Sequence, residues 1–248
     1  MYAIGNVNSG SIRFDSKQAR IAQEGAYKLG DGIQIKGAVS LTDQQAIMDY
    51  KTGYLEAELL WDTRASDVGW DTPQVISHGS LASVWAGHEN ITNNFRDLWR
   101  YGLDLQHYIR IGRGPRVIAL RLHGEGIDAP VDQVPDTELP ALGGPVYLRG
   151  YYIERWRDKV AAVATAEYQW DLSHTLFAAL FVDTGRVYPE LSDLSLDNLR
   201  TGFGVALEFH SAGFQGVRGS MASSTDGGLF FNFYLEPVFT LTPRVERR

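Results

Sequence analysis

Apolar and polar residues alternate along much of this chain. The clearest example is residues 159–172, where one set of alternate residues is almost wholly apolar and ends in Tyr168 and Trp170. The opposite set includes Glu167 and Gln169. Successive side chains of a β-strand point to opposite faces of the sheet, so this period of two predicts a strand with one apolar and one polar face. The run is much longer than the usual strand of about five or six residues.

The same alternation predicts antiparallel strands throughout the chain. They are placed at about residues 2–14, 17–29, 32–42, 52–64, 74–88, 97–111, 115–127, 157–172, 174–188, 199–211, 214–224 and 228–241. Short connections such as Gly30-Asp31 and Ala212-Gly213 alternate with long ones, of which residues 128–156 are the longest. Residues 65–73 break this rule, because they form a long connection on the side of the short turns. Short turns at one end and long loops at the other are typical of an outer-membrane β-barrel.

We therefore predict an all-β fold in which residues 1–248 form a single antiparallel transmembrane β-barrel of about 12 strands. Aromatic residues make up 12% of the chain and glycines number 26, while mean hydropathy is −0.20. Such values fit a barrel whose apolar residues face lipid and whose polar residues line a wet lumen. The sequence contains no run of 18 apolar residues, which excludes a membrane-spanning helix.

Other classes of function find little support. The chain has no cysteine, which excludes disulfides and thiolate metal sites. Its net charge of −7, without any basic block, argues against nucleic-acid binding. The six histidines lack metal-binding spacing, and Pro130 and Pro135 interrupt the acidic residues between 128 and 138. We expect no enzymatic activity, no cofactor and no metal site.

The long connection carries a distinctive short motif. It contains Gly143 and Gly144, followed by Leu148-Arg149-Gly150-Tyr151. Glycine permits backbone turns that other residues resist, so these glycines predict a shaped loop. By itself Arg149 would be interpreted as a solvated arginine, because charged side chains are mostly exposed.

Several motifs follow one another between residues 50 and 240. They are Asp62-Thr63-Arg64; the loop motif of Gly143, Gly144, Leu148, Arg149, Gly150 and Tyr151; Glu167; the strand motif of Phe181, Asp183 and Gly185; and a terminal strand with Phe231, Phe233, Leu235 and Phe239. This order resembles the barrel domain of the bacterial surface antigen superfamily, which includes the outer-membrane assembly factors BamA and TamA. Relative to that family, the sequence lacks periplasmic modules, and its strand count implies a shortened form of the 16-strand family barrel.

The resemblance implies that residues 128–156 enter the barrel lumen and that Arg149 pairs there with Glu167 and Asp183. The alternation independently places Glu167 on the polar face of its strand and Asp183 on the face opposite Leu180 and Val182. A guanidinium suits this role, because its planar fork can meet two carboxylates and it keeps its proton.

Two motifs have an ordinary explanation beside the one that the resemblance implies. Asp62, Thr63 and Arg64 end a predicted strand, where a polar triplet usually caps a turn. The terminal strand would carry an assembly signal and form one side of a seam with the first strand, although the last strand of any barrel is apolar and aromatic. The chain also continues past the terminal aromatic as a C-terminal extension, residues 241–248.

Three functions remain open. The first is a bacterial outer-membrane barrel that inserts or translocates other proteins through the seam, with lipid or lipopolysaccharide and unfolded outer-membrane proteins as partners. The second is a passive anchor, pore or secretion channel for a fused or partner passenger domain. The third is a soluble β-sandwich binding module. Residues 1–10 have neither a basic nor an apolar region, so the signal peptide of an exported protein would lie outside this sequence.

Overall fold

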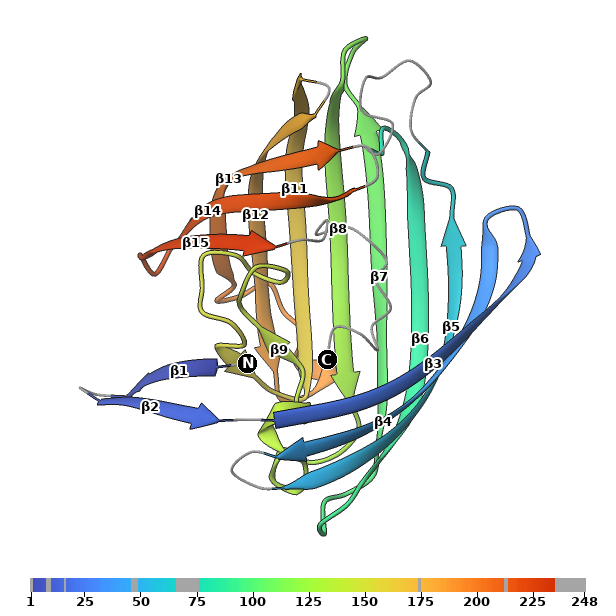
Figure 1. Cartoon of the computed structure of the whole chain (residues 1–248), viewed down its shortest axis with the longest axis vertical. Helices are drawn as coiled ribbons and strands as arrows, with labels where there is room; N and C mark the ends of the chain where they lie inside the picture. Colours follow the sequence, from blue (N-terminus) through green and yellow to red (C-terminus); the bar gives the residue numbers. More distant parts are fainter. Residues whose placement is uncertain are drawn as a thin grey trace.

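The computed structural model describes residues 2–7, 10–15, 17–45, 49–65, 76–173, 175–211 and 214–234. Most of them belong to one antiparallel sheet of eleven strands, which curls around an interior (Figure 1). In spatial order the strands are β15 (Leu229–Tyr234), β14 (Phe214–Ser224), β13 (Arg200–Ser211), β12 (Leu176–Tyr188), β11 (Val160–Ser173), β8 (Arg116–Ile127), β7 (Leu98–Arg110), β6 (Gly79–Ile91), β5 (Tyr50–Asp62), β4 (Ile33–Gln45) and β3 (Lys17–Gly30).

Eleven of the twelve predicted strands correspond to strands of this sheet, with ends that differ by a few residues. The strand predicted at residues 2–14 is wrong. There, β1 (Tyr2–Val7) and β2 (Gly10–Asp15) pair with each other as a separate two-stranded sheet. The segment lacks the sustained apolar face of the later strands, and its sequence contains Asn-Ser-Gly, residues that favour a chain reversal.

The strands β3 and β15 are the two edges of the sheet. Among the described residues, β3 pairs with β4 and β15 pairs with β14, and no residue of one edge pairs with the other. Each edge strand therefore has one side whose backbone N–H and C=O groups have no strand partner among the described residues.

The two faces of the sheet have opposite character. On β5, Leu55 and Leu59 are 64% and 53% exposed, whereas Tyr54 and Glu56 on the other face are 4% and 6% exposed. Large apolar side chains thus point outward, and charged and polar side chains are buried on the inner face. A β-sandwich is excluded, because it would pack two sheets through their apolar faces, whereas the eleven-stranded sheet of the described residues has its apolar face outward.

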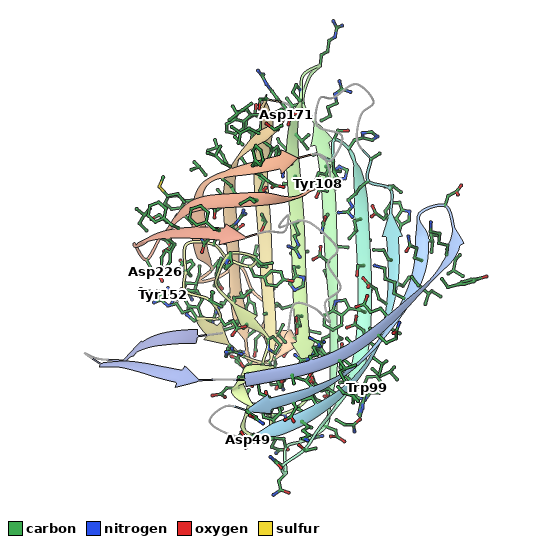
Figure 2. The ribbon with its side chains drawn as sticks, in the orientation of Figure 1. Asp49, Trp99, Tyr108, Tyr152, Asp171 and Asp226 are labelled. Carbon is green, nitrogen blue, oxygen red and sulfur yellow. The ribbon has the colours of Figure 1, made fainter. Side chains whose placement is uncertain are left out.

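The ends of the strands also differ. Long connections join β6 to β7, β8 to β11 and β12 to β13, and they all lie at the end of the sheet where β5 begins. Figure 2 shows Asp49 and Trp99 toward this end and Asp171 at the opposite one. No helix among the described residues is long and apolar enough to cross a membrane, which has no bearing on crossing by strands.

Residues 128–159, which we call the lumen loop, join β8 to β11 and fold back against the inner face. Their short elements are η1 (Val131–Gln133), η2 (Asp136–Glu138), β9 (Ala141–Leu142) and β10 (Trp156–Arg157), and a further 3-10 turn, η3 (Leu191–Asp193), follows β12. Because β9 pairs with β10, residues 141–157 form a hairpin-like loop that is closed at its base, and we call it the RGY hairpin.

Candidate functional site

The RGY hairpin is shaped by residues with positive φ. Gly143, Gly144 and Gly150 have φ angles of +119°, +97° and +92°, and Leu148 is at +67°. Only glycine adopts such angles freely, which explains the three glycines of the motif. Leu148 tolerates its conformation within an apolar cluster, where it is fully buried.

Glycines also allow the hairpin to lie directly on the sheet. A Cβ on Gly150 would collide with the carbonyl oxygen of Ser223 on β14, and a Cβ on Gly202 of β13 would collide with the carbonyl oxygen of Arg149. Removing side chains from both surfaces lets the two backbones approach each other. The Arg149 side chain is thereby brought down to the inner wall.

Arg149 is enclosed by acids from two neighbouring strands. Its Nε donates to Asp183 Oδ2 at 2.7 Å and its Nη2 to Asp183 Oδ1 at 2.7 Å, while the backbone N–H donates to Oδ2 at 2.9 Å. Its Nη1 donates to Glu167 Oε1 at 2.5 Å. All three side chains are at most 2% exposed. The structure thus brings together the arginine and the two acids that the sequence singled out.

Two further residues belong to this site that the sequence analysis missed. Arg218 of β14 donates to the same Glu167 Oε1 at 2.7 Å and to Glu208 Oε2 of β13 at 3.2 Å. Glu208 and Arg218 are direct cross-strand partners. Opposite charges on the polar faces of two consecutive strands were the available signal, but the register of those strands is needed to see that they meet.

Phe181 supplies an apolar support for the arginine. The Arg149 guanidinium carbon lies 3.5 Å from the centroid of the Phe181 ring, a cation–π arrangement. A Cβ on Gly204 would meet that ring at 2.8 Å, so a glycine on β13 leaves room for it. Gly185 makes space elsewhere, because a Cβ there would lie 2.6 Å from the carbonyl oxygen of Ala162 on β11.

Two tyrosines fix the hairpin on either side of Arg149. The Tyr151 hydroxyl donates to the carbonyl oxygen of Thr201 at 3.2 Å. Tyr147 stacks on His123 of β8, with ring centroids 4.4 Å apart. His123 in turn contacts Asp104 of β7 at 3.1 Å. The hairpin therefore contacts the inner face from β8 to β14.

The other predicted motifs lie away from Arg149. Arg64 donates to both carboxylate oxygens of Asp62, at 2.9 and 2.8 Å, and to Gln106 Oε1 at 2.9 Å, while Thr63 pairs with Ser80. This turn follows the end of β5, opposite the lumen loop.

The terminal strand, β15, also has no part in the Arg149 site. Phe231 and Phe233 point outward and are 65% and 81% exposed. Leu235 and Phe239 lie outside the described residues, as do residues 241–248.

The site has the properties of a structural clamp. Two arginines and three acids are buried among their partners, and removing one member of such a network leaves an uncompensated buried charge. Among the described residues, no group of three or more His, Cys, Asp or Glu side chains is placed to hold a metal ion. The geometry supports a role in holding the hairpin to the wall.

Solved structures share this architecture. BamA from Haemophilus ducreyi lacking POTRA domains 1–3 superposes with a TM-score of 0.64 at 13% sequence identity, over 91% of this chain and 54% of that chain. CdiB from Acinetobacter baumannii superposes with a TM-score of 0.59 at 14% identity, over 89% of this chain and 42% of that one. The eleven-stranded sheet is therefore similar in fold to the barrels of BamA and CdiB.

The predicted likeness to outer-membrane assembly barrels is confirmed at the level of the fold. The chain spans about half the length of the Omp85-family structures that it matches. No family model and no curated protein sequence matches it.

Proposed function

We propose that this chain is an outer-membrane barrel that inserts or translocates other proteins. The observation that carries the proposal is the Arg149 clamp, in which a loop arginine is bound by Asp183 and Glu167 inside a fold shared with BamA and CdiB. A network buried to this extent is retained where one loop conformation matters. The clamp would keep the hairpin in place while other parts of the barrel change.

The part that changes is the seam between β3 and β15. An unpaired strand edge is a template for another strand, so a client β-hairpin would add to either edge through backbone hydrogen bonds. Outside that seam, the exposed apolar residues of the sheet would contact the lipid of the bacterial outer membrane. Unfolded outer-membrane proteins are then the clients, and lipid or lipopolysaccharide surrounds the barrel.

A secretion channel or anchor for a passenger domain is the second candidate. The likeness to CdiB favours it as much as the likeness to BamA favours insertion, because the two superpositions have similar TM-scores. In this case the seam would stay closed during function and the passenger would use the lumen.

A reversible lock of the seam distinguishes the two. Because the chain has no cysteine, Phe233→Cys on β15 can be combined with single cysteines scanned along β3 to find a disulfide that forms across the seam. The refolded protein is then tested for insertion of an outer-membrane client into lipid vesicles, oxidised and reduced. We expect insertion to stop on oxidation and to return on reduction.

The matched control is a disulfide between cysteines at Ile35 and Leu59, which are register partners on β4 and β5 and point outward. This lock joins strands that are already paired, so it should leave insertion unchanged. If the seam lock also leaves insertion unchanged, the insertion proposal is wrong and the channel or anchor is favoured.

A further inference from the structure

The lumen loop has a second attachment, away from Arg149. Its first part, residues 128–140, lies over the ends of β5, β6, β7 and β8, and we call it the cap segment. An apolar cluster joins the two; it comprises Tyr50, Ile91, Leu98 and Ile127 at the strand ends, and Ala129, Val134 and Leu139 of the cap segment. The cap segment therefore covers the rim of the sheet at the end of the long connections.

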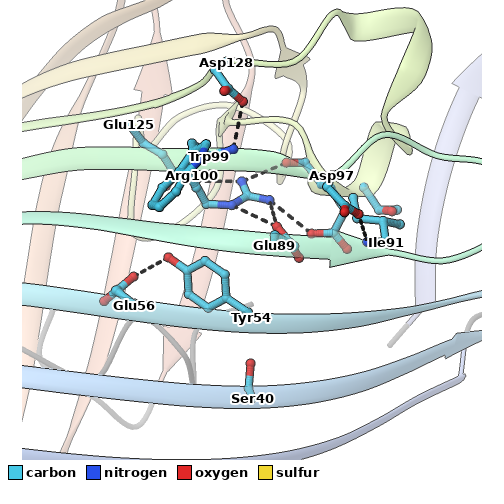
Figure 3. A network of polar contacts seen from close by, with 12 residues as sticks. Ser40, Tyr54, Glu56, Glu89, Ile91, Asp97, Trp99, Arg100, Glu125 and Asp128 are labelled. Atoms are coloured by element: carbon cyan, nitrogen blue, oxygen red, sulfur yellow. Dashed lines mark hydrogen bonds and ion pairs between the residues drawn. The ribbon is translucent and has the colours of Figure 1, made fainter.

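Arg100 of β7 lies at the centre of this attachment and is 2% exposed. Its Nη2 donates to Glu89 Oε2 of β6 at 2.7 Å, and its Nη1 to Glu125 Oε1 of β8 at 3.1 Å (Figure 3). From these neighbours it reaches the cap segment, because Nη1 donates to the carbonyl oxygen of Glu138 at 2.8 Å and Nη2 to Glu138 Oε2 at 3.3 Å. One guanidinium thus joins two strands to the loop.

Tyr50 of β5 completes the attachment. Its hydroxyl donates to Glu138 Oε1 at 2.8 Å and also contacts the hydroxyl of Thr137. Glu138 is therefore held by an arginine through one carboxylate oxygen and by a tyrosine through the other. The acids that surround Arg100 outnumber it, so the cationic charge at this position is needed to keep Glu89, Glu125 and Glu138 together.

The cap segment and the RGY hairpin have separate apolar attachments, although one hydrogen bond joins them, in which Arg157 Nη1 donates to the carbonyl oxygen of Asp136 at 2.7 Å. The apolar cluster beneath the hairpin contains Leu142, Leu148 and Tyr151, and it shares no residue with the cluster beneath the cap segment. The hairpin is closed by the pairing of β9 with β10. In the chain the two parts join at Pro140, which lies between the last residue of the cap cluster and β9.

We propose that Arg100 is a positioning residue that holds the cap segment over the rim independently of Arg149. The signs of the charges on the loop and on the wall are reversed between the two attachments. At Arg149 the loop supplies the cation and the wall supplies the acids, whereas at Arg100 the wall supplies the cation and the loop supplies Glu138. The cap segment can then open or close this end of the interior while the hairpin stays in place, whichever of the two candidate functions holds.

Thiol labelling in single-cysteine proteins tests the independence. Ala129→Cys places a buried thiol on the cap segment itself, and Ala161→Cys places one on β11 beneath the hairpin; both alanines are at most 3% exposed. Glu138→Gln is added to each, and the rate of reaction with a maleimide is measured on the refolded protein. We expect labelling at position 129 to accelerate about tenfold and labelling at position 161 to stay unchanged, because a charge-assisted contact of the cap segment alone is lost.

Asp132→Asn is the matched control, since it removes the same charge from an exposed position of the same segment. It should leave both rates unchanged. Arg100→Lys tests the geometry, because a lysine keeps the charge but cannot hold Glu89, Glu125 and Glu138 with one fork; it should accelerate labelling at position 129 only. Tyr50→Phe is a second test, because it removes one hydrogen bond to Glu138 without leaving a buried charge unpaired. It should accelerate labelling at position 129 by a smaller factor.

The outcomes separate cleanly. Acceleration confined to position 129 supports the proposal. Equal acceleration at both positions would show that the loop opens as one unit, and an effect of Asp132→Asn equal to that of Glu138→Gln would assign the change to net charge. Unchanged labelling in Glu138→Gln and in Tyr50→Phe would show that Arg100 does not hold the cap segment. Each of these three results overturns it.

Discussion

The inner face of the sheet differs between its two sides: it is closely packed along β11 to β14 and more exposed along β4 and β5. Along β11 to β14 the RGY hairpin covers the wall, and the charged groups beneath it are almost fully buried and closely paired. On the inner face of β4 and β5, the Lys36–Glu58 pair is longer, at 4.0 Å, and its two side chains are 27% and 12% exposed. The filled side is thus far from the β3 edge, and the less covered side lies next to it.

This difference predicts a gradient of mutational effects. Buried ion pairs lose several kcal/mol when one partner is removed, whereas exposed pairs contribute little. The covered wall should respond strongly to single substitutions, and the wall near β3 should hardly respond.

Arg149→Ala should have the largest effect. It leaves Asp183 without its cation and Glu167 with Arg218 alone, and an uncompensated buried charge typically costs about 3–5 kcal/mol. We expect residues 141–157 to become sensitive to protease while the barrel keeps its compact, heat-modifiable migration on a gel. An RGY hairpin that stays resistant to protease in this variant would show that the clamp does not hold it.

Gly202→Ala should come next. The added methyl group would overlap the carbonyl oxygen of Arg149, so the hairpin backbone must move away from β13. Overpacking of this kind typically destabilises by about 1–3 kcal/mol, which urea unfolding in detergent would measure. Gly37→Ala on β4 is the control, because the new Cβ would lie 3.8 Å from its nearest neighbour, an ordinary contact. Equal losses in the two variants would show that the collision with the Arg149 carbonyl oxygen is not the cause.

Glu208→Gln should have an intermediate effect. Arg218 would keep its contact with Glu167 but exchange a charged partner for a neutral one, so a loss of about 1–2 kcal/mol is expected. Combining it with Arg149→Ala tests the network, since the two substitutions act on groups that share Glu167. Strict additivity in this double-mutant cycle would show that the two arginines are not coupled.

Lys36→Met should have the smallest effect. Its ion pair with Glu58 is long, and the lysine side chain is 27% exposed, so the change should stay within about 0.5 kcal/mol. A loss as large as that in Glu208→Gln would mean that the wall beside β3 is as tightly built as the covered one.

Much of the fold could be predicted from the sequence, because alternation of apolar and polar residues shows which side chains share a face of a strand. The same parity placed Glu167 and Asp183 on the inner face, where the structure has them. Parity says nothing of register or of which distant strands approach one another, so the contact of Arg218 with Glu167 could not be predicted. The second attachment of the loop could not be predicted for a similar reason: Glu138 is one of several acidic residues between 128 and 138, and only its contact with Arg100 distinguishes it.

The place of the lumen loop in the chain has a consequence for the order of folding. The loop leaves β8 and returns to β11, two strands that pair directly with each other, so this part of the sheet can form before the loop is fixed. The groups that receive Arg149 lie on β11 and β12, and the network is completed by Glu208 and Arg218, which come later in the chain. A nascent molecule therefore carries an arginine whose binding site does not yet exist, and burial of that side chain marks the moment at which the C-terminal half has joined the sheet.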